Sequence, residues 1–150
     1  MDPTAERQLH LTIGSRFENI ELVQMSVDEA LAEQGVSDDV RHWIGLAVRE
    51  AVANAIKHGN RLDAEKRVDI DVELGADEIE IRVRDQGVGF DPNAVKDPLA
   101  PENRFRADGR GIFYMNRSMD DVRYSFHPEG GTVVTLRRRL APGPGGGVER

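Results

Sequence analysis

Two neighbouring runs of alternating residues constrain the fold of this chain more than any other feature. Val68 to Leu74 and Glu78 to Val83 alternate apolar with charged residues, and Gly75-Ala76-Asp77 separates them. A period of two places the apolar side chains of a strand on one face. A short break that contains glycine is typical of a hairpin. The pattern therefore predicts an antiparallel hairpin with one buried face.

Two segments before this hairpin carry apolar residues at helical spacing. In residues 17–33 the spaced apolar positions are Ile20, Val23, Val27, Ala30 and Leu31. Gly35 ends this helix, and Ser37 can cap a second helix that runs to about His58. The inward stripe of the second helix consists of Ile44, Ala47, Val48, Ala51 and Ala55.

The second helix also presents a carboxylate and an amide one turn apart. Glu50 and Asn54 project from the same side because the helix advances by about 100° per residue. They flank the apolar stripe, so we expect them at the rim of the core, where a pocket can form. A carboxylate there can accept a proton or orient a hydroxyl, and an amide oxygen can hold a hard cation such as magnesium. Alone, this pair is more typical of a solvated helix edge.

Two glycine-containing stretches follow. In Arg84-Asp85-Gln86-Gly87-Val88-Gly89-Phe90, an Asp ends the second strand of the hairpin, and its glycines allow a close backbone approach. An Asp in this place can accept a hydrogen bond from the exocyclic amine of adenine. In Asp108-Gly109-Arg110-Gly111-Ile112, small residues lead into an apolar helix, whose first backbone N–H groups can cradle phosphate. Each stretch alone is also compatible with an ordinary turn or helix start.

The remaining pattern completes an α/β (α+β) two-layer sandwich, with helices on one face of a mixed, mostly antiparallel sheet. His10 to Ile13 is a predicted first strand, and Ile112 to Met119 a predicted helix. Val122 to Phe126 and Thr132 to Leu136 form a closing hairpin. We expect one domain over residues 8–140 and a disordered Pro/Gly-rich tail over residues 141–150.

Composition excludes several classes of function. The chain has no cysteine, so disulfides and thiolate metal sites are excluded. The net charge of -7 disfavours direct binding of nucleic acid, which needs a basic surface. No apolar run approaches the roughly 20 residues of a membrane helix, and no signal peptide opens the sequence. We expect a cytoplasmic protein that contacts neither membrane nor nucleic acid.

Taken in order, the helix motif and the two glycine stretches resemble the N box and glycine boxes of the GHKL ATP-binding superfamily. Its histidine-kinase-like ATPase (Bergerat) fold is shared by histidine kinases and gyrase-type ATPases. The closer resemblance is to bacterial anti-sigma factor serine/threonine kinases. The compact length, Ser118-Met119-Asp120-Asp121-Val122 and the closing Gly130-Gly131-Thr132-Val133-Val134 are similar to that branch. The resemblance runs from about Leu9 to Arg139.

The resemblance implies a set of site residues for ATP and Mg²⁺. Asn54 would coordinate magnesium, Asp85 would read the adenine amine, and Glu50 would act on the attacking hydroxyl. The other residues that would line the nucleotide are Gly87, Gly89, Gly109, Arg110, Gly111 and Thr132. Lys57 matches a lysine that histidine kinases direct at phosphate, and it is equally compatible with a solvated lysine.

The segment from Gln86 to Asp108 would be a short ATP lid. Its arginines, Arg104 and Arg106, could neutralise phosphate together with Arg110, or could only keep the lid solvated. No separate helical segment carries a phosphoacceptor His, so autophosphorylation in the histidine-kinase manner is not expected. The second glycine box lacks the third glycine of some relatives, which argues against a gyrase-like lid.

Two classes of function follow. The first is an ATP-dependent protein serine/threonine kinase that phosphorylates an anti-anti-sigma protein of the STAS type, sequesters a sigma factor, and forms a homodimer. The second is a regulatory module that binds ATP and a partner without phosphoryl transfer. Glu50 favours the kinase, because nucleotide sensing alone needs Asn54 and Asp85 but no base. Related ATPases, however, use this glutamate to activate water.

Overall fold

The computed structural model describes residues 7–87 and 115–140. Within these ranges the first half of the chain forms β1 (Arg7–Gly14), α1 (Glu18–Glu33), α2 (Asp38–Asn54) and a π-helical turn η1 (Ala55–Gly59). The second half forms β2 (Arg67–Leu74), β3 (Glu78–Arg84), β4 (Asp121–Phe126) and β5 (Thr132–Arg139). Residues 115–118 are helical and lead into β4.

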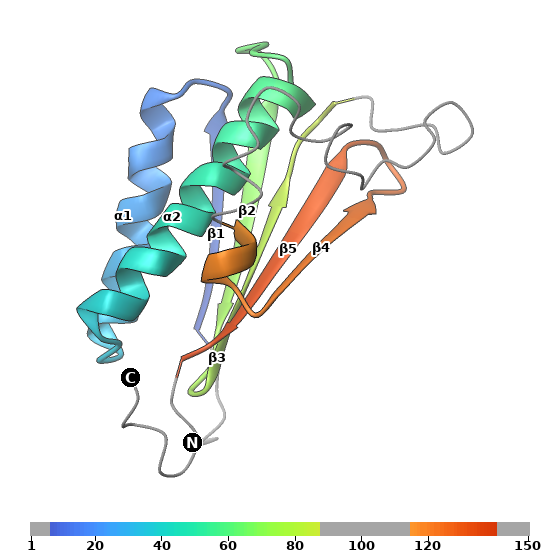
Figure 1. The fold of residues 1–150 in the computed structure, drawn as a ribbon. Helices are drawn as coiled ribbons and strands as arrows, with labels where there is room; N and C mark the ends of the chain where they lie inside the picture. Colours follow the sequence, from blue (N-terminus) through green and yellow to red (C-terminus); the bar gives the residue numbers. More distant parts are fainter. Residues whose placement is uncertain (1–6, 88–114, 141–150) are drawn as a thin grey trace.

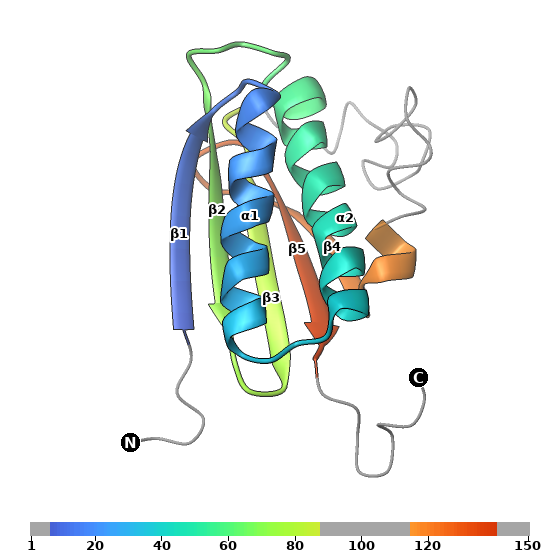
Figure 2. The ribbon, with the colours of Figure 1, turned by 90° about the vertical axis from the view of Figure 1, so that its left-hand side faces the viewer.

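The strands form one sheet in the order β1-β2-β3-β5-β4, and all of the described pairings are antiparallel. Both long helices lie side by side on one face of this sheet (Figures 1 and 2). The predicted two-layer sandwich is confirmed. β5 lies between β3 and β4, so the closing hairpin pairs with β3 through its second strand.

The core lies between the helices and the sheet. The predicted stripes of both helices are buried, and so are the apolar positions of the hairpin, which are Val68, Ile70, Val72, Leu74, Ile79, Ile81 and Val83. Met115 and Met119 close the core beside β4 and β5. Burying one such aliphatic side chain contributes about 1.5–3 kcal/mol, so the alternating runs supply much of the stabilisation.

The helix ends follow the predicted signals. The hydroxyl of Ser37 accepts a hydrogen bond from the Val40 N–H at 3.3 Å, which satisfies one of the donors left free at the start of α2. α1 ends at Glu33, and the Gly35 N–H donates to Ala32 O at 3.0 Å. Both ends of α1 and the start of α2 therefore lie within a residue or two of their predicted places.

The opposite face of the sheet is polar and held by cross-strand ion pairs. His10 pairs with Asp71 at 2.6 Å, Arg82 with Glu73 at 3.5 Å, and Arg137 with Glu78 at 3.2 Å. The hydrogen bond to Asp71 raises the pKa of His10 above its usual range. These charges explain why the alternating runs bury only one face.

The structure extends or revises several predicted elements. β1 begins at Arg7, three positions before the prediction, because its whole length pairs with β2 from Leu74 to Arg67. The second helix ends as an α-helix at Asn54, and its predicted last turn to about His58 is π-helical. Of the helix predicted over residues 112–119, the described part is helical at 115–118. The tail at residues 141–150 lies outside the described residues.

Candidate functional site

Asn54 ends helix α2 with a buried side-chain amide. Its nitrogen and oxygen are both buried, and neither has a hydrogen-bond partner among residues 7–87 and 115–140. A buried polar group left in this way costs about 1–3 kcal/mol. Glu50 lies one turn earlier on the same helix and is half-buried. The pair therefore lies at the rim of the core, with a polar group prepared for a ligand.

The chain changes its helical geometry directly after Asn54. In the π-helical turn η1, the Asn60 N–H donates to Ala55 O at 2.8 Å, five residues back. Such turns are rare overall, but those that do occur are often found at functional sites. The sequence prediction of an α-helix to about His58 is therefore wrong for this last turn. A single π-helical turn is too short to alter the spacing of apolar residues, so the sequence pattern does not reveal it.

Lys57 lies in the middle of this π turn. It is half-buried, and within the described ranges its ammonium makes no ion pair or hydrogen bond. No described residue therefore competes with a phosphate oxygen for this ammonium. Its role in binding phosphate stays a prediction.

Asp85 follows the last residue of β3 and is 5% exposed. One carboxylate oxygen, Oδ1, accepts hydrogen bonds from the Gly87 N–H at 2.9 Å and the Thr132 N–H at 3.1 Å. Burial raises the pKa of Asp85, and the two backbone hydrogen bonds oppose this shift. Within residues 7–87 and 115–140 both hydrogen bonds of this carboxylate go to Oδ1, so Oδ2 could accept one from a ligand.

Thr132 lies beside Asp85 at the start of β5. The Asp85 N–H donates to Thr132 O at 3.1 Å, and the Thr132 N–H donates back to the Asp85 side chain. The backbone of Thr132 thus fixes the rotamer of the carboxylate. The structure brings these two predicted site residues together.

Two glycines allow the backbone to pass close to Asp85. A Cβ built on Gly59 would overlap Asp85 Oδ2, and a Cβ built on Gly131 would overlap the Asp85 carbonyl oxygen. Gly131 also has a φ of +95°, which side chains rarely adopt. The end of η1 therefore lies against the free carboxylate oxygen, so that Asp85 meets the segment that begins at Asn54.

Sequence reasoning did not assign Gly59 or Gly131 to the site, although Gly131 lies in the closing motif quoted above. Their roles depend on which backbone passes nearby, and a single sequence does not state this. Gly89, Gly109, Arg110, Gly111 and the lid arginines Arg104 and Arg106 lie outside the described residues.

The acceptors present fit a magnesium ion held mainly by nucleotide phosphates. Mg²⁺ is commonly bound by one or two protein oxygens together with phosphates and water. The unpartnered amide oxygen of Asn54 is a suitable protein ligand for such an ion. Within residues 7–87 and 115–140, no cluster of three or more His, Asp or Glu side chains could hold a metal without the nucleotide.

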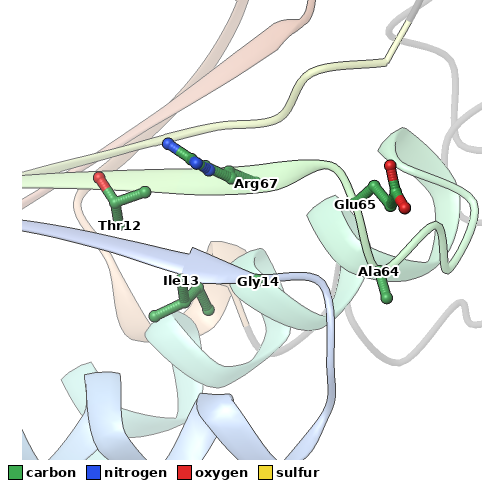
Figure 3. A pocket seen from close by; sticks show the side chains of 6 residues that line it. All are labelled: Thr12, Ile13, Gly14, Ala64, Glu65 and Arg67. Carbon is green, nitrogen blue, oxygen red and sulfur yellow. The ribbon is translucent and has the colours of Figure 1, made fainter.

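A separate hollow of about 600 Å³ lies at the end of β1 and the start of β2. Thr12, Gly14, Glu65 and Arg67 are among the residues that line it. Figure 3 shows Thr12 and Arg67 on one side of the strands and Ile13 on the side of the helices, so the polar groups do not converge. None of the predicted site residues within the described ranges lines this hollow.

Comparison with known proteins places these features in a family context. The family model described as the histidine kinase-like ATPase domain matches residues 13–138. Serine-protein kinase RsbW of Listeria innocua is 26% identical over 140 residues, which are 89% of this chain and 88% of that protein. Anti-sigma F factor of Bacillus subtilis is 30% identical over 138 residues, which are 91% of this chain and 94% of that protein.

One solved structure, of the RsbU and RsbW domains of a Mycobacterium tuberculosis protein, is similar with a TM-score of 0.65. Its sequence is 24% identical, and the match covers 89% of this chain and 32% of that longer one. At this identity the likeness supports the fold. In the described part of the chain, no helix is long and apolar enough to cross a membrane.

Proposed function

Because the chain belongs to the histidine kinase-like ATPase domain family, we propose that it is an ATP-dependent protein serine/threonine kinase of a partner-switching system. It phosphorylates an anti-anti-sigma protein of the STAS type and sequesters a sigma factor. Two similar proteins carry the names serine-protein kinase and anti-sigma F factor, which together describe these two activities. A protein with these partners acts in the cytoplasm, and it acts as a homodimer.

The observation that carries this proposal is the pairing of Glu50 with Asn54 on one helix. Asn54 presents a buried amide with no partner in the described ranges, and Glu50 lies one turn away at the same rim. Asn54 would hold Mg²⁺, which when bound neutralises charge on the phosphates of ATP. A module that only sensed ATP would need the amide but no carboxylate beside it.

The other residues of the site bind and orient ATP. Oδ2 of Asp85 would accept a hydrogen bond from the exocyclic amine of adenine, while Oδ1 stays bound to the protein. Guanine presents a carbonyl oxygen in the equivalent ring position, which an ionised carboxylate repels. Lys57 would neutralise phosphate charge. Gly87, Gly89, Gly109, Arg110, Gly111 and Thr132 would line the nucleotide.

The transfer step needs alignment more than covalent chemistry. The hydroxyl oxygen of a Ser or Thr on the partner would attack the γ-phosphorus of ATP. The bond between this phosphorus and the β–γ bridging oxygen would break, so that ADP leaves. The carboxylate of Glu50 would accept the hydroxyl proton.

The proposal is tested by identifying and modifying the partner. Proteins that co-purify with the chain are identified, and a STAS-type protein among them is incubated with Mg-ATP and the purified chain. We expect its intact mass to increase by one phosphate, located on a Ser or Thr. A chain that binds both ATP and the STAS-type protein tightly but adds no phosphate would show that it is a binding module.

A further inference from the structure

Asn60 is a fully buried polar residue that no step of the proposed function uses. It directly follows the π turn η1. Its side-chain oxygen accepts a hydrogen bond from the Gln86 N–H at 2.7 Å. Its side-chain nitrogen donates to Ser15 Oγ at 2.8 Å and to Arg67 O at 2.9 Å. Every bond that this amide makes therefore goes to a different segment of the chain.

These three partners lie at three strand ends. Ser15 follows β1, Arg67 begins β2, and Gln86 lies two residues after the end of β3. The Arg67 N–H also donates to the Gln86 side-chain oxygen at 2.5 Å, which closes the cluster. Asn60 thus ties the end of the π turn to one corner of the sheet. A residue that only satisfied its own turn would not need partners at the ends of three strands.

The hydrogen-bonded cluster around Asn60 lies next to Asp85, the proposed adenine-reading residue, because two of its members adjoin the contact between Gly59 and Asp85 in the chain. Asn60 follows Gly59, whose Cα lies against Asp85 Oδ2, and Gln86 follows Asp85. The hydrogen bond from Gln86 to Asn60 therefore connects the two chain segments directly beside the contact between Gly59 and Asp85. If this bond were lost, the strand end that carries Asp85 could move relative to the helix that carries Asn54.

We propose that Asn60 is a positioning residue for nucleotide selection, acting through Asp85. It fixes where the free carboxylate oxygen of Asp85 lies relative to the end of η1, and so sets the match to adenine. The inference rests on the proposed role of Asp85 in reading adenine. Asn60 is too deeply buried to touch a nucleotide itself.

The test compares the ratio of ATP to GTP affinity in Asn60→Ala and Ser15→Ala, measured by calorimetry with magnesium. Ser15→Ala is the matched control, because it removes a buried partner of the same amide but keeps the bond between Asn60 and Gln86. We expect the ratio to fall about tenfold or more in Asn60→Ala, since a misplaced binding group loses much of its effect. In Ser15→Ala the ratio should stay near that of the wild type.

Asn60→Ser provides a second variant with a smaller cavity, in case Asn60→Ala does not fold. Its hydroxyl is one bond shorter than the amide and does not reach the Gln86 N–H. Unfolding curves of all variants measure the general loss of stability separately. In an Asp85→Asn background, Asn60→Ala should cause no further loss of selectivity, because the residue through which it acts is already changed.

Two results would overturn the inference. If the Asn60 variants lose stability but keep the wild-type affinity ratio, Asn60 is purely structural and the proposed function is unaffected. If the loss of selectivity is the same in the Asp85→Asn background, Asn60 does not act through Asp85. A wild-type protein that binds ATP and GTP equally would instead contradict the adenine-reading role itself.

Discussion

Among single side chains, Asp85 shows most clearly how the fold prepares a ligand site. Two backbone N–H groups hold one of its oxygens, and a glycine leaves room for the other. The sequence predicted the place of Asp85 after a strand, and its role in reading adenine stays a prediction. It could not indicate that Gly59 forms the wall beside it, because the two positions are 26 residues apart and meet only in the folded chain.

Asp85→Asn should weaken binding of ATP and remove the preference over GTP. The variant amide can still accept the two backbone hydrogen bonds, but it then presents an NH₂ group to the adenine amine, so that two donors face each other. We expect a loss of about 1.5–3 kcal/mol, the typical value for a hydrogen bond to a charged group. Calorimetric titration with Mg-ATP and Mg-GTP measures both effects. Equal affinities in the wild type would remove the basis of the adenine assignment.

The raised pKa of Asp85 predicts how stability without nucleotide depends on pH. As pH rises above 3.8, the unfolded chain releases this proton before the folded chain does. The folded state then binds more protons, so its stability relative to Asp85→Asn should fall as pH rises through the raised pKa and then level off. Unfolding curves of both proteins over this range give the difference. A difference that grows with pH would contradict the burial effect.

Gly59→Ala should disrupt the site, because the new methyl group would overlap Asp85 Oδ2. Overpacking of this kind typically costs about 1–3 kcal/mol, and here it would also displace the oxygen that we propose reads adenine. Gly45→Ala in helix α2 is the control, since its nearest neighbour, Gln24 Nε2, would be 3.9 Å away. That change should stabilise the helix by about 0.5–1 kcal/mol. Unfolding curves and ATP titrations are measured for both variants. If Gly59→Ala and Gly45→Ala had the same stability and the same ATP affinity, the assigned contact between Gly59 and Asp85 would be wrong.

Helix α2 with its π turn is the element that joins the two parts of the site. Apolar spacing predicted the inward face of this helix, because burial of Ile44, Val48 and Ala51 repeats with the helical period. The same spacing could not predict the π turn. There the backbone hydrogen bonds span five residues, while the apolar pattern stays in place. Likewise the start of β1 before His10 was not predicted, because Arg7 is held by pairing with Leu74 and not by its own pattern.

Asn54→Ala should make the protein without nucleotide as stable as the wild type or more so. The change removes two buried atoms that lack partners in the described part of the chain and introduces a better helix former. The expected gain is up to about 1–3 kcal/mol. The variant should nevertheless lose the stabilisation that Mg-ATP gives, which for the wild type is about 2.7 kcal/mol at one hundred times its Kd.

Asn19→Ala is the control for this change. The Asn19 amide donates to Gly14 O at 3.0 Å, so its removal should lower stability and leave the effect of Mg-ATP intact. Thermal unfolding of the three proteins, with and without Mg-ATP, separates these expectations. A large loss of stability without nucleotide in Asn54→Ala would mean that its amide has a structural role.

In the part of the chain that the structure describes, the sheet and helices form a scaffold in which most buried polar side chains have partners. The ion pairs of the open sheet face and the cluster around Asn60 are complete. The amide of Asn54 is the contrast, since it is buried and has no partner within the described ranges. The fold could be predicted from the periodicity of apolar residues. Which buried polar groups have hydrogen-bond partners could not, because the partners come from distant parts of the chain.

The rate of phosphoryl transfer by Glu50→Gln tests the central claim most directly. The amide keeps the shape of the side chain but cannot accept the proton of the attacking hydroxyl. The measurement is the initial rate at which the co-purifying STAS-type protein gains phosphate mass from Mg-ATP, with calorimetric ATP affinity measured alongside. We predict a loss of about 10²–10⁴-fold in rate, the usual contribution of a general base, with little change in affinity. A variant that transfers phosphate as fast as the wild type would contradict the account.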